Sequence, residues 1–181
     1  MPVLLVNQVS RSSIATGKIL YVMTIAILNS IFTFIGLIIA FKLGGPAFGA
    51  ENLNLSSLSV STLVGLFITL LTMSGLAAAL IVLLGSIARN VKEGSGYVMP
   101  IYIMAIVLGI ATMQMESPDN PLLYLIPLVN SIFVMKDIIT VNFVTARFLL
   151  MLISNLAYVS IFIYFLTRVF NSERIMDSSG S

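Results

Sequence analysis

Long apolar stretches separated by short polar ones dominate the hydrophobic pattern of this chain. Each of four stretches, about 19 residues or longer, can cross a bilayer as a helix that rises about 1.5 Å per residue. They run from about Gly17 to Phe41, Ser59 to Ile87, Gly96 to Gln114 and Phe148 to Phe170. The pattern predicts an all-α integral membrane protein with about four transmembrane helices.

A fifth apolar stretch is too short to cross. It runs from Leu122 to Met135 and is interrupted by Pro127 and Asn130, and a span needs about 20 apolar residues. It predicts a short re-entrant or interfacial helical hairpin on the outer side, which Lys136-Asp137 closes at the outer boundary.

Helix breakers and charges mark the connections between these stretches. Residues 42–57 predict a loop on the far side, Arg89–Gly96 a short cytoplasmic turn, and Glu116–Pro121 an outer loop. We expect residues 1–170 to form one polytopic membrane domain. The polar tail 171–181 cannot bury a core, so we expect it to be disordered on the cytoplasmic side.

The amino-acid composition supports an integral membrane protein and argues against several kinds of functional site. Hydrophobic residues make up 59% of the chain and charged residues 9%, with a mean hydropathy of +1.09. The chain has no Cys and no His, which removes thiolate metal sites and the commonest general base. The net charge of +2 is too small and scattered to suggest nucleic-acid binding. We therefore expect no cofactor and no nucleic-acid partner.

The distribution of cations predicts the orientation, because cytoplasmic loops carry more Lys and Arg. One side of the predicted topology has six cations: Arg11, Lys18, Arg89, Lys92, Arg168 and Arg174. The other side has Lys42, Lys136 and Arg147. Both termini should therefore be cytoplasmic, as an even number of spans requires.

Polar residues inside the spans suggest helix contacts or a transport path. Asn29 and Ser30 lie near the middle of the first span, and Asn155 lies inside the fourth. Such side chains normally face another helix or a cavity, and both interpretations remain open. Arg147 and Arg168, at the two ends of the fourth span, are placed where long cationic side chains can snorkel to the surface.

Other features of the spans concern packing and shape. The second span is rich in small residues that let helices approach closely, such as Gly75 and Ala79. Pro100, near the start of the third span, removes a backbone donor, and a kink is expected there.

The opening stretch from Leu4 to Lys18 is polar enough to lie in water yet leads directly into the first span. It predicts a membrane-surface element at the cytoplasmic interface, held by attraction to anionic head groups. A helix cap with juxtamembrane anchors is the simpler alternative.

Three ordered segments carry a resemblance to a known family. The first has Leu5, Val9, Ser10, Ile14, Gly17 and Lys18; the second has Ala88, Arg89, Lys92, Glu93 and Pro100; the third has Pro127, Leu128, Val129 and Asn130 followed by Lys136 and Asp137. Together they resemble the permeases of ABC-2 type transporters, especially the sodium-efflux branch. The family usually has Thr-Pro where this chain has Asn7-Gln8.

The resemblance implies a permease subunit of an exporter that a separate ATPase drives. It implies an ATPase-coupling set of Val9, Ser10, Arg11, Gly17, Lys18, Arg89, Lys92 and Glu93. The candidate pathway or outer-gate set combines four residues of the third segment with two polar residues inside the spans: Pro127, Asn130, Lys136 and Asp137, with Asn29 and Asn155. The chain has no phosphate-binding loop, since Thr16-Gly17-Lys18-Ile19 lacks the preceding glycine and the following hydroxyl residue, so ATP must bind to another subunit.

The matched region, from Leu4 to about Phe170, corresponds to the carboxyl-terminal half of a usual family member. The chain is therefore expected to be a fragment, a truncated paralogue or part of a split permease, with a second copy or another subunit supplying the missing spans. A non-transporting membrane scaffold or accessory protein is the alternative function. A membrane-embedded hydrolase is disfavoured because no Asp, Glu or His lies within a predicted span.

Overall fold

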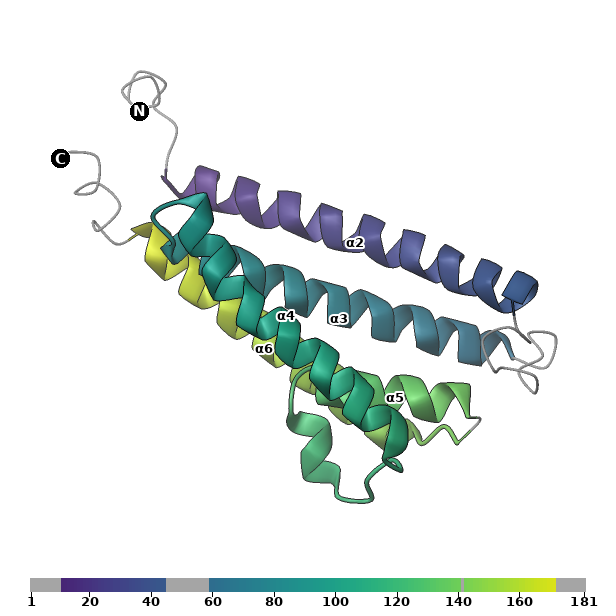
Figure 1. The fold of residues 1–181 in the computed structure, drawn as a ribbon. Coiled ribbons are helices and arrows are strands. Elements are labelled where there is room, and N and C mark those ends of the chain that lie inside the picture. The colour runs from purple at the N-terminus through teal and green to yellow at the C-terminus, as the bar shows by residue number, and fades with distance from the viewer. Residues whose placement is uncertain (1–10, 45–58, 141, 172–181) are drawn as a thin grey trace.

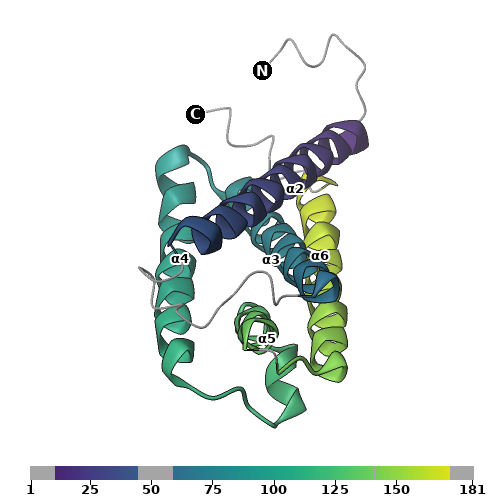
Figure 2. The same cartoon turned by 90° about the vertical axis from the view of Figure 1, so that its right-hand side faces the viewer.

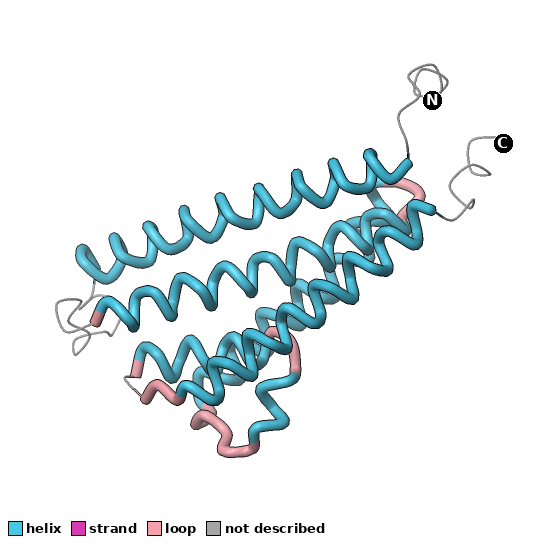
Figure 3. Tube along the Cα trace, turned by 180° about the vertical axis from the view of Figure 1, so that it is seen from behind, coloured by secondary structure: helices cyan, strands magenta, loops and turns pink. Residues whose placement is uncertain are grey.

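The computed structural model describes residues 11–44, 59–140 and 142–171, and every regular element in these ranges is a helix (Figures 1 and 3). In chain order the elements are α2 (Arg11–Gly44), α3 (Val60–Ile87), α4 (Val91–Gln114), η3 (Pro121–Leu125), α5 (Val129–Ile139) and α6 (Thr145–Asn171). Residues 1–10, 45–58 and 172–181 lie outside the described residues, and with them the predictions for Val9, Ser10, most of the far-side loop and the tail.

Four of these helices are long and apolar enough to cross a membrane. Their candidate spans are Gly17–Ala40, Val60–Ile87, Val91–Thr112 and Thr145–Val169. The predicted fold class is confirmed: an all-helical chain with four helices that could span a membrane and a short helical hairpin between the third and fourth.

Two predicted boundaries were wrong. The predicted first span agrees with the candidate span Gly17–Ala40, but α2 itself runs from Arg11 to Gly44, so the start of the predicted far-side loop is helical. The predicted turn 89–96 is also much shorter, because α4 begins at Val91. α4 then continues through Pro100 to Gln114, so the proline does not end the helix.

α3 lies at the centre of the bundle and packs against all of the other α-helices (Figure 2). α2 crosses one side of α3 and α6 lies along another, while α4 stands further out. The buried core lies where α3, α6, η3 and α5 meet, and its members are Leu66, Tyr124, Phe133, Val134, Ile138 and Met151. Gly65 of α3 faces this core, and a Cβ there would lie 3.4 Å from Ile138 Cδ1, at van der Waals contact.

The hairpin formed by η3 and α5 enters the bundle and leaves it at the same end (Figure 1). Near its deeper part, Ser154 of α6 donates a hydrogen bond to the Leu125 carbonyl at 2.8 Å. Asp119 before the hairpin and Asp137 near its end both contact Arg147, at the start of α6. The re-entrant path is therefore confirmed, and α5, with 11 residues, is too short to cross.

The start of α2, the α3–α4 turn and the end of α6 lie together at the other end of the bundle (Figure 1). The described cations there are Arg11, Lys18, Arg89, Lys92 and Arg168. This arrangement matches the predicted grouping of cations within the described part of the chain.

Candidate functional site

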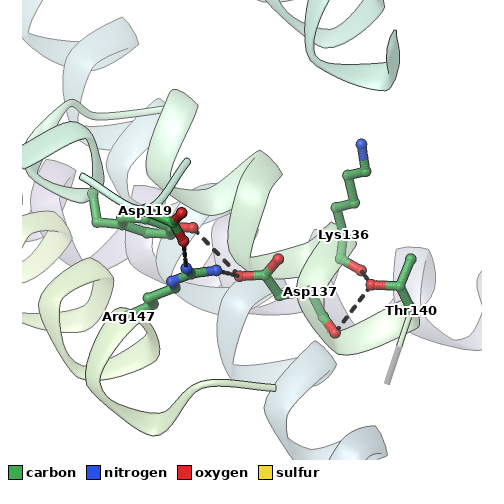
Figure 4. A network of polar contacts seen from close by, with 6 residues as sticks. Asp119, Lys136, Asp137, Thr140 and Arg147 are labelled. Carbon is green, nitrogen blue, oxygen red and sulfur yellow. Dashed lines mark hydrogen bonds and ion pairs between the residues drawn. The ribbon is translucent and has the colours of Figure 1, made fainter. Parts of the chain in front are cut away.

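An ionic cluster ties the hairpin to α6 (Figure 4). Arg147 donates from Nη1 to Asp137 Oδ2 at 3.3 Å and from Nη2 to Asp119 Oδ1 at 2.9 Å. The Tyr124 hydroxyl donates to the same Asp137 oxygen at 3.4 Å. The Arg147 guanidinium lies 5.5 Å from the centre of the Tyr124 ring, within the range of a cation–π interaction. Three segments thus contact one guanidinium, which α6 supplies.

The two carboxylates of this cluster lie in different environments. The Asp137 side chain is 4% exposed, whereas that of Asp119 is fully exposed. A buried carboxylate depends on its cation much more than one in water does. Arg147, which the sequence placed where it can snorkel to the surface, is 18% exposed and pairs with both carboxylates. Sequence reasoning missed the pairing because its partners lie 10 and 28 residues away.

Burial raises the pKa of Tyr124 above its ordinary value, and the negative charge of the nearby Asp137 carboxylate raises it further. The tyrosine therefore stays protonated near neutral pH and can donate to Asp137.

No described buried side-chain nitrogen or oxygen lacks a hydrogen-bond partner.

Lys136 and Asp137, which the sequence predicted to close the hairpin, lie within three residues of its end. Both lie in the last turns of α5, which continues to Ile139, and Asp137 is buried and paired with Arg147. Lys136 Nζ donates to the Met115 carbonyl at the end of α4. The Lys136 and Asp137 carbonyls cap the end of α5 by accepting bonds from Thr140 and Asn142.

A second polar network holds the inner end of α5. Asn130 Nδ2 donates to Asn155 Oδ1 at 3.0 Å, and Asn155 Nδ2 donates to Ser131 Oγ at 2.9 Å. Asn130 Oδ1 accepts from the Ser131 backbone N–H, and Asn155 Nδ2 lies 3.3 Å from Met151 Sδ. Asn130, Ser131 and Asn155 are all buried. The structure thus joins two members of the predicted pathway set in one closed network.

Strain accompanies this network at the start of α5. Leu128 has φ 69° and ψ −54°, the one non-glycine positive φ among the described residues. Such a conformation costs about 1–3 kcal/mol and persists when the surroundings hold it in place. Pro127 precedes it, and the Asn130 backbone N–H still reaches the Ile126 carbonyl at 3.0 Å. No glycine stands at or next to position 128, so the sequence contains no signal for this positive φ.

Asn29, the remaining pathway candidate, lies apart from both networks. Its Nδ2 donates to Ser74 Oγ at 3.0 Å, which joins α2 to α3. Ser30 bonds within α2 to Ala26 and lies 3.4 Å from the Leu70 carbonyl of α3. Helix–helix hydrogen bonding, one of the two alternatives for Asn29, is therefore present. The residues predicted for one pathway occupy three separate places.

The α3–α4 turn contains three residues of the predicted coupling set. Asn90 caps α4 by accepting the Glu93 backbone N–H at 2.8 Å, and Glu93 Oε2 accepts the Arg89 backbone N–H at 2.9 Å. Glu93 Oε1 also accepts from the Tyr97 hydroxyl. This is a close variant of a capping box. Glu93 therefore serves the turn itself, while the side chains of Arg89 and Lys92 are exposed and make no hydrogen bond or ion pair within the described chain.

The other members of the coupling set are only partly described. Arg11, Gly17 and Lys18 lie in the first turns of α2, with Gly17 and Lys18 exposed at the end of the bundle that holds the α3–α4 turn. Val9 and Ser10 lie outside the described residues.

The described residues contain no group of three or more His, Cys, Asp or Glu side chains that could hold a metal ion. Comparisons with protein-family models, curated proteins and solved structures found no match to this chain.

Proposed function

We propose that this chain is a membrane-spanning permease subunit of an ABC-2 type exporter in the cell membrane, with both termini cytoplasmic. A separate ATP-binding subunit supplies the energy and a second permease copy or another subunit completes the pathway, so the chain itself is not an enzyme. The substrate leaves the cell; sodium, a drug, a peptide or a lipid-like molecule are the candidate classes. A non-transporting membrane scaffold is the alternative.

The observation that carries the proposal is the cationic α3–α4 turn. Asn90 and Glu93 fix its backbone by hydrogen bonds. The side chains of Arg89 and Lys92 are exposed and make no hydrogen bond or ion pair within the described chain. A rigid turn with two exposed cations is a suitable docking element for an acidic groove on a cytoplasmic partner. The resemblance described above implies an ATPase as that partner.

Reversing both cations, Arg89→Glu with Lys92→Glu, should weaken binding of the ATPase about tenfold or more while membrane insertion stays normal. One exposed charge pair contributes about 0–1 kcal/mol, but two reversed charges facing a complementary surface can cost several kcal/mol. Co-purification and stimulation of ATP hydrolysis would measure the loss.

The matched control is Arg89→Gln with Lys92→Gln, which removes the charges without adding repulsion and should give an intermediate loss. Arg147→Glu would not be a useful control, because Arg147 neutralises a buried carboxylate. If the double-reversal variant binds and stimulates the ATPase like the parent, the turn is an ordinary solvated loop. The alternative of a non-transporting membrane scaffold is then favoured.

Cysteine labelling tests the orientation. A cysteine at Ser95, near the cationic turn, should be shielded from an impermeant thiol reagent in intact cells, whereas one at Ser117, before the hairpin, should react. The absence of native Cys makes each signal specific. Labelling of Ser95 from outside would reverse the proposed orientation.

A further inference from the structure

Asn29 is exposed at the middle of a span. It lies about 12 residues, or about 18 Å, from each end of the candidate span Gly17–Ala40. Its Nδ2 donates to Ser74, but its carboxamide oxygen accepts no hydrogen bond from any described residue. An amide oxygen facing hydrocarbon without a partner is unfavourable.

Thr33, one turn further along the same face of α2, also has hydrogen-bonding capacity that no described residue uses. Several threonines inside the described helices donate to a carbonyl of their own helix, as Thr24 does to Leu20 and Thr69 to Gly65. Thr33 is exposed, and its hydroxyl has no hydrogen-bond partner among the described residues. Two polar groups with unused hydrogen-bonding capacity therefore lie side by side at membrane depth.

The surrounding face suits close helix packing. Phe32 is 69% exposed and Ile25 is 48% exposed, so both offer apolar area. A Cβ added at Gly36 would meet no heavy atom within 4 Å, which leaves room for another backbone to approach. The face therefore combines apolar contact area, a small residue and unpaired polar groups.

We propose that a second copy of this chain packs against this face of α2, with Asn29 meeting Asn29 of that copy. Copies inserted in the same orientation place each residue at one depth, so a two-fold axis along the membrane normal brings identical residues together. A carboxamide both donates and accepts, and a threonine hydroxyl does too, so each can pair with its own copy. This inference does not depend on the transport proposal.

Disulfide cross-linking of single-cysteine variants in vesicles tests the interface. Phe32→Cys and Ile25→Cys should give a covalent dimer with a membrane-permeable oxidant, whereas Ile153→Cys on α6, 65% exposed, should not. Adding Asn29→Leu to the Phe32→Cys variant should lower the dimer yield about fivefold or more, and Asn29→Gln should largely preserve it.

Ser74→Ala in the Phe32→Cys background is the matched control. It removes the partner of Asn29 within the chain but leaves the amide able to pair with the second copy, so the dimer yield should be retained. The proposal is overturned if neither Phe32→Cys nor Ile25→Cys cross-links, or if Asn29→Leu leaves the yield unchanged. Reaction of Asn29→Cys with a water-soluble thiol reagent would also overturn it, because the face would then line an aqueous path.

Discussion

Replacing Arg147 with Ala should destabilise the folded protein by about 3–5 kcal/mol, because the substitution leaves a buried carboxylate without its cation. Asp137 is 4% exposed, and its remaining side-chain donor within the described chain is the Tyr124 hydroxyl at 3.4 Å. Arg147 also joins the segment before η3 to α6 through Asp119. Unfolding in detergent, followed by helical circular dichroism, would measure the change.

Rescue by a second substitution distinguishes electrostatics from lost packing. Asp137→Asn, added to Arg147→Ala, removes the unpaired charge and should recover much of the lost stability. Asp119→Asn alone should have a small effect, since Asp119 is fully exposed. Failure of Asp137→Asn to rescue would mean that Arg147 stabilises the hairpin through packing on Tyr124 instead of through charge.

The spans could be predicted from the sequence because each depends on a local property, the length of an apolar run. The hairpin could be predicted for the same reason: Leu122–Met135 is too short to cross, and Pro127 interrupts it. Such inferences need no knowledge of which residues meet in space. They located all four candidate spans, although two boundaries were several residues off.

One of these boundary errors could have been avoided. Asn90 and Glu93 have the spacing of a helix cap and its reciprocal partner, which indicates a helix that begins immediately after Asn90. The glycines Gly94 and Gly96 favoured a longer turn instead. The extension of α2 back to Arg11 had no comparable signal, because Arg11–Thr16 is polar and the apolar pattern does not include it.

The candidate site depended on contacts that no local pattern specifies. Asn130 and Asn155 were singled out as polar residues in apolar surroundings, but nothing in the sequence shows that they bond to each other. Arg147 has the position of an interfacial anchor, and only the fold shows that Asp137 faces it. Residue type therefore predicted which side chains matter, and the packing of the hairpin determined their partners.

The hairpin is held at two depths by different chemistry. Its outer end is fixed by the charges around Arg147, and its inner end by the neutral network of Asn130 and Asn155. The strained Leu128 lies next to the inner network, so the hydrogen bonds there help to maintain a backbone conformation that would otherwise relax. Loss of the inner network should therefore loosen the hairpin even when the ionic contacts remain.

Asn155→Ala tests this inner attachment and should destabilise the protein by about 2–4 kcal/mol. The substitution leaves Asn130 Nδ2 without its acceptor and removes the donor to Ser131 Oγ, which still donates to Asn130 Oδ1. It also opens a cavity at a fully buried position. Resistance to unfolding by a denaturing detergent in mixed micelles would measure the loss. The leucine at 156, exposed on the same helix, provides the control, and Leu156→Ala should have little effect.

A double-mutant cycle isolates the bond itself from the cavity. Asn130→Ala and Asn155→Ala should each destabilise, but the double variant should lose less than the sum, because the second substitution removes a group that the first left unpaired. Hydrogen bonds between membrane helices give coupling energies of about 0.6 kcal/mol on average and about 1.7 kcal/mol at most. Both amides are fully buried and each has a further contact, so a value in the upper half of that range is expected. Strict additivity would show that the two asparagines stabilise the hairpin independently and that the hydrogen bond between them contributes nothing of its own.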